Sequence, residues 1–354
     1  SFGGPIPVVS GVTTQLGTYA NFGIARNGTL VYEAGGGANV GAAAQQELVV
    51  IPFDGEPSAV PIEPRAYRNV SWSPDGASIA FSALEPGSSS GQTRIFVYNL
   101  DLRTATRQIT YTGTQGWPVW SPDGTRLVYT SSLADGGGAL GSVQGADLYL
   151  KTVYDDADPV HLVEMEDNQY PYDWSRDDHI VFTNNVGASS DLVWTRPDPE
   201  ASVEVYLDID EDLGAVDISP DGRFAAFASN EAGDFEIFVR SFPTPRQPVQ
   251  VSRGGGDRPR WSPRGDAIYY WKDGGAAGDT LMRAEVETTP TFAVRQVAPV
   301  LDGSFALGTW DLHPDGDRII VARTLREEDD VPPQRYILVV NWFTELGEAL
   351  GVGR

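Results

Sequence analysis

The chain has 354 residues, no cysteine and a formal net charge of −24, with 25 lysine and arginine residues against 49 aspartate and glutamate residues. This acidic excess argues against nucleic-acid binding, because phosphate backbones are bound by clustered basic side chains. The absence of cysteine excludes disulfides and thiol sites, and no segment approaches the about 18 consecutive apolar residues of a membrane-spanning helix.

A short phrase recurs seven times along the chain, most clearly as VSWSPDG at Val70–Gly76. The residues aligned before its Ser-Pro are Ile24, Trp72, Trp120, Trp174, Ile218, Trp261 and Leu312. They are separated by 48, 48, 54, 44, 43 and 51 residues. A regular spacing of about 40–50 residues, built from strand patterns, is typical of a β-propeller.

Each repeat predicts a four-stranded blade. The first strand ends at the aligned residue, and Pro-Asp-Gly then forms a tight turn, because proline presets φ and glycine supplies a positive φ. An alternating run such as Ser78–Ser82 predicts the second strand, and runs such as Arg94–Leu100 and Arg107–Tyr111 predict the third and fourth. In the last repeat, Tyr336–Trp342 is the expected third strand, and Pro5–Val9 would add the fourth and close the ring.

The sequence therefore predicts an all-β fold, a single closed seven-bladed propeller over residues 1–342 with four antiparallel strands per blade. Residues 1–10 are the closing strand, and residues 343–354 form a C-terminal tail. The expected blades are 17–62, 63–112, 113–165, 166–211, 212–253, 254–300 and 301–342.

The innermost strands predict a charged channel. If the aligned residues pack between blades, two-residue periodicity turns the preceding residue toward the axis. Those residues are Gly23, Ser71, Val119, Asp173, Asp217, Arg260 and Asp311. Two interpretations follow: Arg260 forms a structural ion-pair network with its neighbours, or Asp173, Asp217 and Asp311 bind a cation, with structural calcium as the candidate. No cofactor is required.

The residues before each inner strand are expected to surround the channel mouth. They are Tyr19, Asn21, Tyr67, Arg68, Asn69, Gln115, Trp117, Gln169, Tyr170, Arg258 and Thr309. Converging aromatic and guanidinium groups are typical of a binding surface, although packing between blades explains some of these residues equally well.

Catalytic motifs are weak. Ser89 lies in a G-x-S-x-G pattern, but in a predicted loop and not at a strand–turn–helix elbow. The histidines, His161, His179 and His313, have no metal-ligand spacing. The run Asp208, Asp210 and Asp212 lacks the glycine and glutamate that a helix–loop–helix calcium loop needs.

The repeats resemble the TolB-type, WD40-like propeller repeat. A more detailed resemblance rests on an ordered set of phrases: Gly3–Val12, Asn27–Tyr32, Pro64–Gly76, Phe238–Pro243, Gln250–Tyr270, Val286–Phe292 and Val339–Leu346. Together they are similar to the C-terminal propeller of membrane-bound bacterial serine/threonine protein kinases. That resemblance, which extends to stand-alone relatives of this propeller, implies a non-catalytic, extracytoplasmic sensor or interaction domain. Two alternatives follow for the parent polypeptide: the propeller is tethered to a membrane-bound kinase, or it is a secreted relative that never had one. The chain itself carries no kinase signature.

The leading hypothesis is a binding propeller, not an enzyme, that recognises a protein, peptide or glycan at its funnel face. A lyase-type or glycosidase-type propeller is the first alternative, and it would need paired carboxylates in an open cleft. A structural or self-assembling surface protein is the second. The fold by itself does not decide between them.

Overall fold

The computed structural model describes residues 45–84, 92–103, 106–132, 145–186, 189–209, 211–273, 279–303 and 309–325, and the short strands 14–15, 19–20, 22–24, 30–34 and 335–339. The chain divides into two compact units. One is Ala43–Leu325, and the other combines Ser1–Ala42 with Arg326–Arg354.

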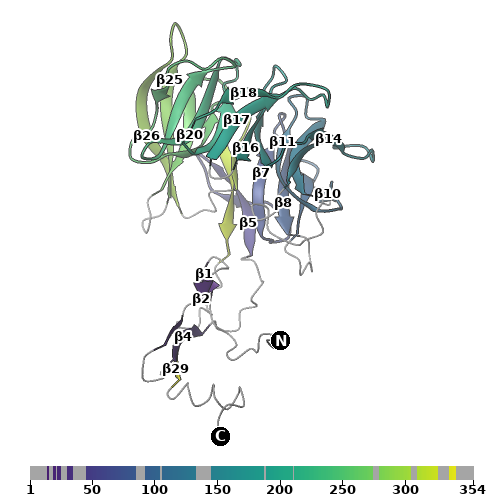
Figure 1. The fold of residues 1–354 in the computed structure, drawn as a ribbon, viewed down its shortest axis with the longest axis vertical. Coiled ribbons are helices and arrows are strands. Elements are labelled where there is room, and N and C mark those ends of the chain that lie inside the picture. Colours follow the sequence, from purple (N-terminus) through teal and green to yellow (C-terminus); the bar gives the residue numbers. More distant parts are fainter. Residues whose placement is uncertain are drawn as a thin grey trace, which may run out of the picture. The chain divides into compact units, whose positions relative to one another are not determined.

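The larger unit is a propeller whose described residues form six four-stranded antiparallel sheets (Figure 1). The innermost strands are β7 (Tyr67–Trp72), β11 (Thr114–Trp120), β15 (Asn168–Trp174), β19 (Leu213–Ile218), β23 (Asp257–Trp261) and β27 (Trp310–Leu312). The second strands are β8 (Ser78–Leu84), β12 (Arg126–Ser132), β16 (Ile180–Val186), β20 (Phe224–Ala232), β24 (Ala267–Lys272) and β28 (Arg318–Thr324).

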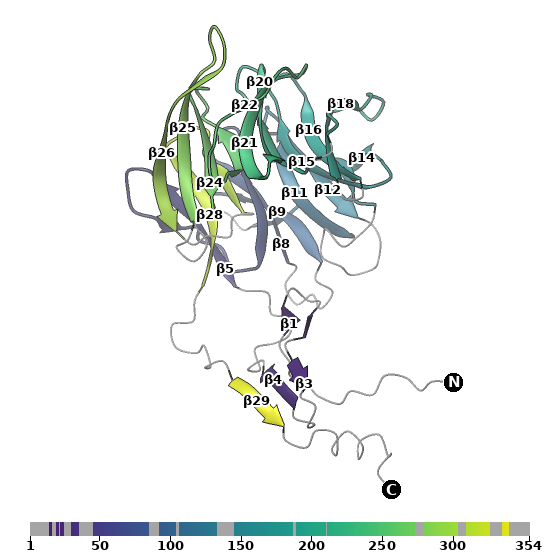
Figure 2. The ribbon, with the colours of Figure 1, turned by 60° about the vertical axis from the view of Figure 1, so that its left-hand side comes forward.

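The outer half of each blade varies more in length. The third strands are β9 (Thr93–Asn99), β13 (Asp147–Thr152), β17 (Ser189–Thr195), β21 (Asp234–Ser241), β25 (Asp279–Glu287) and β5 (Gln46–Pro52). The outermost strands are β10 (Arg107–Gln108), β14 (Val160–Val163), β18 (Glu204–Leu207), β22 (Val249–Gln250), β26 (Ala293–Gly303) and β6 (Ser58–Ala59). Figure 2 shows the long β25–β26 hairpin projecting beyond its neighbours.

The recurring Ser-Pro-Asp-Gly phrase joins the first and second strands of a blade. In the first blade, the Gly76 N–H donates to the Ser73 carbonyl at 2.8 Å, and Gly76 has a φ of 70°. The Asp75 carboxylate accepts bonds from the Ser73 hydroxyl at 2.5 Å and the Ala77 N–H at 3.1 Å. The predicted turn chemistry is confirmed at the level of individual atoms.

The core lies between blades, because each sheet is covered on both faces by its neighbours. Along β8, Ile79 and Phe81 belong to the cluster shared with β5 and β28, whereas Ala80 packs with the next blade. The four aligned indoles, Trp72, Trp120, Trp174 and Trp261, are 4–6% exposed. Their predicted role as core residues between blades is confirmed.

The ring is closed by strands from both ends of the propeller. In the sixth blade, β27 and β28 come from the C-terminal end, and β5 and β6 come from the N-terminal end. The central pairing joins β28 to β5 in antiparallel register, with Val321 opposite Val49. The prediction of seven blades is therefore wrong. The segment Gln46–Pro52, expected within the first blade, is the third strand of the last. The proposed closing segment Pro5–Val9 and the tail 343–354 lie outside the described residues.

The smaller unit contains the copy of the repeat that does not form a blade. There β29 (Arg335–Val339), β4 (Leu30–Ala34) and β3 (Phe22–Ile24) form a three-stranded sheet, and β1 (Thr14–Gln15) pairs with β2 (Tyr19–Ala20). Tyr336, expected in the last blade, pairs instead with Glu33. This copy has Ala25 and Arg26 where the first blade has Ser73 and Pro74, so it lacks the hydroxyl and the fixed φ on which the turn depends.

Among the described residues, no helix has the length and apolar character needed to cross a membrane.

Candidate binding channel

A central cavity of about 580 Å³ runs between the inner strands. The residue preceding each aligned position lines it, as two-residue periodicity predicts. These residues are Ser71, Val119, Asp173, Asp217, Arg260 and Asp311. The seventh predicted position, Gly23, lies in β3 of the smaller unit. The sequence therefore identified all six channel positions of the ring and added one that does not belong to it.

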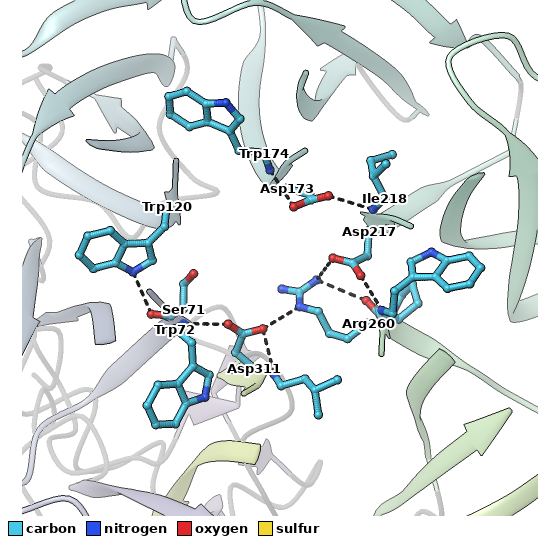
Figure 3. A network of polar contacts seen from close by, with 12 residues as sticks. Ser71, Trp72, Trp120, Asp173, Trp174, Asp217, Ile218, Arg260 and Asp311 are labelled. Carbon is cyan, nitrogen blue, oxygen red and sulfur yellow. Dashed lines mark hydrogen bonds and ion pairs between the residues drawn. The ribbon is translucent and has the colours of Figure 1, made fainter. Parts of the chain in front are cut away.

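Each channel aspartate joins its own blade to the next one around the ring (Figure 3). The Asp173 carboxylate accepts the Ile218 N–H at 2.9 Å, and the Asp217 carboxylate accepts the Trp261 N–H at 2.6 Å. The Asp311 carboxylate accepts the Trp72 N–H at 2.8 Å, which links the last blade to the first. Because each carboxylate satisfies a main-chain donor of the neighbouring inner strand, it fixes the spacing of two blades.

Arg260 lies between two of these carboxylates. Its Nε donates to Asp311 Oδ1 at 2.9 Å, and its Nη1 lies 3.8 Å from Asp217 Oδ1. Among the described residues, Asp173 forms no ion pair within 4.0 Å. The ion-pair interpretation thus describes two of the three aspartates. The third relies on its main-chain donors, the N–H groups of Ile218 and Trp174.

The channel favours proton uptake by its carboxylates. Burial raises the pKa of Asp217 well above its usual value, and the nearby Asp173 carboxylate raises it further. Burial also raises the pKa of Asp173. Burial alone would lower the pKa of Arg260, but the carboxylates of Asp311 and Asp217 outweigh that effect and raise it. The guanidinium therefore stays charged, and the excess negative charge falls on Asp173 and Asp217.

The calcium hypothesis stays a prediction. In the described part of the chain, one group of three carboxylate or imidazole side chains has its ligand atoms within 4.8 Å of one another, and it comprises His313, Asp315 and Asp317. The three channel aspartates do not form such a group, so a shared ion would require them to move closer. In the His313 group, Arg318 already supplies positive charge, at 2.9 Å from Asp315 and 3.1 Å from Asp317.

At the mouth, two side chains project from a left-handed backbone. Trp117 and Arg258 both have a φ of 51° and occupy equivalent positions before a proline. Each lies at a β-bulge, where the pairing register shifts between Gly116 and Val119 or between Asp257 and Arg260. Such a φ is strained for a residue with a Cβ and is often retained where it directs a functional side chain.

Three of the predicted mouth residues, Asn69, Trp117 and Arg258, line the cavity. The Trp117 ring lies 4.5 Å from the ring of Tyr170, another predicted residue, and the main-chain N–H of Trp117 donates to Asn69 Oδ1 at 3.2 Å. Arg258 pairs with Asp257 at 2.9 Å. The half-buried side chains of Trp117 and Arg258 form an aromatic and guanidinium rim, whereas Tyr170 is buried beside it and does not line the cavity.

Other predicted mouth residues lie elsewhere. Tyr67, Gln115, Gln169 and Thr309 are buried, and Arg68 is exposed outside the lining of the cavity. Several join neighbouring blades: Thr93 donates to the Gln115 carbonyl at 2.5 Å, Thr130 to that of Gln169 at 2.7 Å, and Thr309 to that of Arg68. Tyr19 lies in β2 of the smaller unit, and Asn21 lies outside the described residues.

Sequence reasoning missed two sets of channel residues. Tyr172 and Trp310, two positions before the aligned residue, also line the cavity. At Tyr172 the pairing register shifts between Pro171 and Asp173, so the alternation changes there. The residues two positions after the aligned residue also contribute: Pro74, Pro122, Arg176, Pro220, Pro263 and Pro314. This second set could have been predicted from the sequence, because the proline belongs to the recurring phrase. The phrase predicts a turn, however, and does not by itself show that the proline faces the channel.

The remaining motifs do not form a catalytic arrangement in the described residues. Ser89 and Asp210 lie outside them. His161 faces Asp147 at 3.1 Å, and the His313 ring packs edge-on against Trp72. His179 Nδ1 lies 3.3 Å from Ser175 Oγ, but its Nε2 faces the Arg196 guanidinium and not a carboxylate. The third group of a hydrolase triad is therefore replaced by a cation.

Comparison with known proteins places this architecture among propellers. No family model matches the chain, and no curated protein matches it in sequence. Among solved structures, a TolB of Agrobacterium tumefaciens superposes with a TM-score of 0.63 at 16% identity, covering 80% of this chain and 99% of its own. A TolB of Acinetobacter baumannii superposes with a TM-score of 0.54 at 15% identity, covering 80% of this chain and 64% of its own. The chain is similar in fold to TolB-type propellers.

Enzymes occur among the similar structures too. A puromycin-hydrolyzing peptidase of Mycobacterium tuberculosis has a TM-score of 0.53 at 15% identity. The match covers 80% of this chain but 45% of the peptidase, so the chain spans about half of that enzyme. At such low identity the likeness establishes the fold alone.

Proposed function

We propose that the propeller is a binding domain that recognises a protein, through an exposed peptide segment, at the mouth of its central channel. The observation that carries this proposal is the open cavity rimmed by Trp117 and Arg258, both held in left-handed conformations over a fixed polar ring. Aromatic and arginine side chains dominate the binding energy of protein interfaces. A rim that is already in place lowers the entropy lost on binding.

The similar structures support a binding role more than a catalytic one. They include two TolB proteins and a chain of the nidogen–laminin complex, which has a TM-score of 0.53 at 9% identity. The peptidase match covers less than half of the enzyme. Within the channel, the carboxylates of Asp173 and Asp217 accept main-chain N–H bonds, which does not favour a general acid and base pair acting on a bound substrate.

The test is selection of peptides from a displayed random library on the intact protein. We expect selected peptides to bind saturably and to lose about tenfold or more in affinity with Trp117→Gly or Arg258→Gly. Glycine is the suitable replacement, because it removes the side chain without straining a positive φ. Tyr154→Ala is the matched control, since Tyr154 is 62% exposed and does not line the channel. Peptides that bind both rim variants as tightly as the wild type would overturn the proposal.

The location and parent protein are separate proposals. The ordered phrases that resemble the propeller of membrane-bound kinases support an extracytoplasmic sensor domain. Protease treatment of intact cells and spheroplasts that produce the natural gene product tests the location. Digestion of the propeller without lysis of the inner membrane is the expected result. Protection until the cells are lysed would contradict it.

A further inference from the structure

A second cavity of about 340 Å³ lies at the seam where the ring closes, and it does not share the lining of the channel. Its wall includes Tyr67, Phe81 and Tyr98 of the first blade, together with Ile62 from the segment that enters that blade. These aromatic residues belong to the cluster that the first and last blades share.

The cavity lies beside the short outer strand of the closing blade. Strand β6 has two residues, Ser58 and Ala59, and the chain then crosses to β7. The crossing segment is held at one end, where the Val60 N–H donates to the Leu48 carbonyl at 2.8 Å. The aromatic residues Tyr67, Phe81 and Tyr98 line the cavity from within the core, since each is at most 3% exposed.

Arg65 is the one basic side chain in this lining, which consists entirely of described residues. Its main chain is fixed by a reciprocal pair with Gln46, with N···O distances of 2.9 and 3.0 Å. Its guanidinium lies 4.8 Å over the Phe96 ring. The position of the charge is therefore set by the closure of the ring.

The guanidinium is incompletely paired. Its Nη1 is buried and has no hydrogen-bond partner among the residues that the structure describes. Its Nη2 lies 3.7 Å from the carboxylate of Glu63, whose side chain is 84% exposed. A pair at that distance with such an exposed partner is weak. A buried donor without an acceptor is unfavourable, and a carboxylate is the group that matches the two-pronged guanidinium.

We propose that this seam pocket binds an apolar carboxylate, meaning an aromatic or branched aliphatic group that ends in a carboxylate. The apolar group would lie in the cavity that Ile62, Phe81 and Tyr98 line, and the carboxylate would take the place beside Arg65 that the exposed Glu63 carboxylate now occupies. The lining combines apolar and aromatic side chains with one basic and one acidic residue, Arg65 and Glu63, and a few convergent polar groups in a small-molecule pocket fix the orientation of its ligand. Burial raises the pKa of Tyr67 to about 12 despite the adjacent Arg65, so its phenol stays neutral and adds no competing charge.

The test uses calorimetric titration of the full chain with N-acetyl-L-phenylalanine and, for comparison, its uncharged amide. We expect saturable binding of the acid and at least about tenfold weaker binding of the amide, because only the acid can form the charged bond. Arg65→Met keeps much of the stem over Phe96 and should lower affinity for the acid about tenfold. Glu63→Gln should raise that affinity, since it removes the competing carboxylate.

A second ligand distinguishes the two kinds of molecule that could supply an apolar carboxylate, a protein C-terminus and a small organic acid. Tighter binding of a tripeptide ending in a free phenylalanine carboxylate than of the amino-acid derivative would identify a protein C-terminus, and the reverse would identify a small organic acid. If Arg65→Met does not fold, as judged by circular dichroism, Arg65→Lys replaces it and should weaken binding through loss of the planar fork. Equal binding of acid and amide, no saturation up to about 10 mM, or an unchanged affinity in Glu63→Gln would each overturn the proposal. None of these results bears on the channel mouth.

Discussion

The carboxylate of Asp311 accepts a hydrogen bond from the main-chain N–H of Trp72 at 2.8 Å, although the two residues are 239 positions apart. The same carboxylate receives the Arg260 Nε at 2.9 Å and the Leu312 N–H at 3.0 Å. One side chain therefore joins the fifth, sixth and first blades. Among the described residues, no other channel aspartate combines an ion pair at this distance with a hydrogen bond between the last blade and the first.

Asp311→Ala should lower the free energy of unfolding by about 3 kcal/mol, because it leaves the partly buried Arg260 guanidinium and two main-chain donors without this acceptor. Asp173→Ala is the matched comparison, since Asp173 also accepts two N–H bonds but has no ion pair within 4.0 Å among the described side chains. Urea denaturation should show the smaller loss for Asp173→Ala, by about 1 kcal/mol or more. Equal losses would mean that the Arg260 contact contributes nothing.

Asp217→Asn should change how stability depends on pH. The pKa of Asp217 is raised in the folded state by burial and by Asp173. Its contribution to stability is therefore fully present below its unfolded pKa of about 4 and is lost as pH rises through the folded-state value. Asparagine can still accept the Trp261 N–H without the charge. The variant should be more stable than wild type at pH 7, with the difference shrinking toward pH 3.

Chemical denaturation of both proteins across that pH range measures the effect of Asp217→Asn. A constant difference at every pH, or a variant less stable than wild type at pH 7, would show that Arg260 compensates the Asp217 charge fully.

Trp120→Phe should destabilise the protein more than Trp72→Phe. Both indoles are buried between blades, but Trp120 Nε1 donates to the Ser71 carbonyl at 3.2 Å, whereas Trp72 Nε1 is buried without a hydrogen-bond partner in the described part of the chain. The hydrogen bond should account for a difference of about 1 kcal/mol, measured by thermal and urea unfolding. Alanine at either position should cost about 3–5 kcal/mol through the cavity it leaves. A loss below about 1 kcal/mol for either alanine variant would exclude a core role.

Asp123→Ala should reduce acid sensitivity. The Ser121 hydroxyl and the Thr125 N–H hold the pKa of Asp123 down at about 2. The contribution of the Asp123 carboxylate to the free energy of unfolding is present above its unfolded pKa of about 4 and is lost as pH falls through the folded-state pKa. Because the group is mostly exposed, the expected loss at pH 7 is about 1 kcal/mol or less. Asp156→Ala, at a fully exposed side chain, is the control. An identical acid transition in Asp123→Ala and wild type would contradict the expectation.

Calcium should raise the melting temperature if Asp173, Asp217 and Asp311 share a bound ion, because a ligand selective for the folded state stabilises it. Asp217→Asn should then abolish the increase. Calorimetric titration is the direct measurement. No heat and no thermal shift up to millimolar calcium would leave the ring as a network of ion pairs and main-chain hydrogen bonds.

The sequence predicted the blades well where the determinants are local. The turn at Ser73–Gly76 and the burial of Trp72 depend on neighbouring residues, so a single repeat is enough to predict both. The number of blades is different, because Gln46–Pro52 reads as a strand whichever partner it has. Its pairing with Arg318–Thr324 depends on contacts across the whole ring. Alternation alone assigned this strand to the first blade and Tyr336–Trp342 to the last.

The channel residues, too, could be predicted from the sequence only where the pairing of the strands is regular. Two-residue periodicity correctly directed Asp173, Asp217 and Asp311 to the axis, because no register shift separates them from the aligned residues. Upstream, the bulges at Trp117 and Arg258 insert an extra residue. Beyond a bulge, counting by twos no longer identifies the exposed face, so Gln115 was expected at the mouth but is buried. The position of Arg65 beside a cavity could not be predicted, because it depends on how the first and last blades meet and not on the repeated phrase.

The pairing of β5 with β28 has a mechanical consequence. Gln46 lies opposite Thr324, and the Leu325 N–H donates to the Gln45 carbonyl at 2.9 Å, so the chain enters and leaves the ring at the same point. A pulling force applied through the two flanking segments would load this pair at one end and separate its hydrogen bonds one after another. Strands loaded from opposite ends would instead have to break them all together. The ring should therefore open at low force at its seam, while the five blades built from continuous chain remain folded.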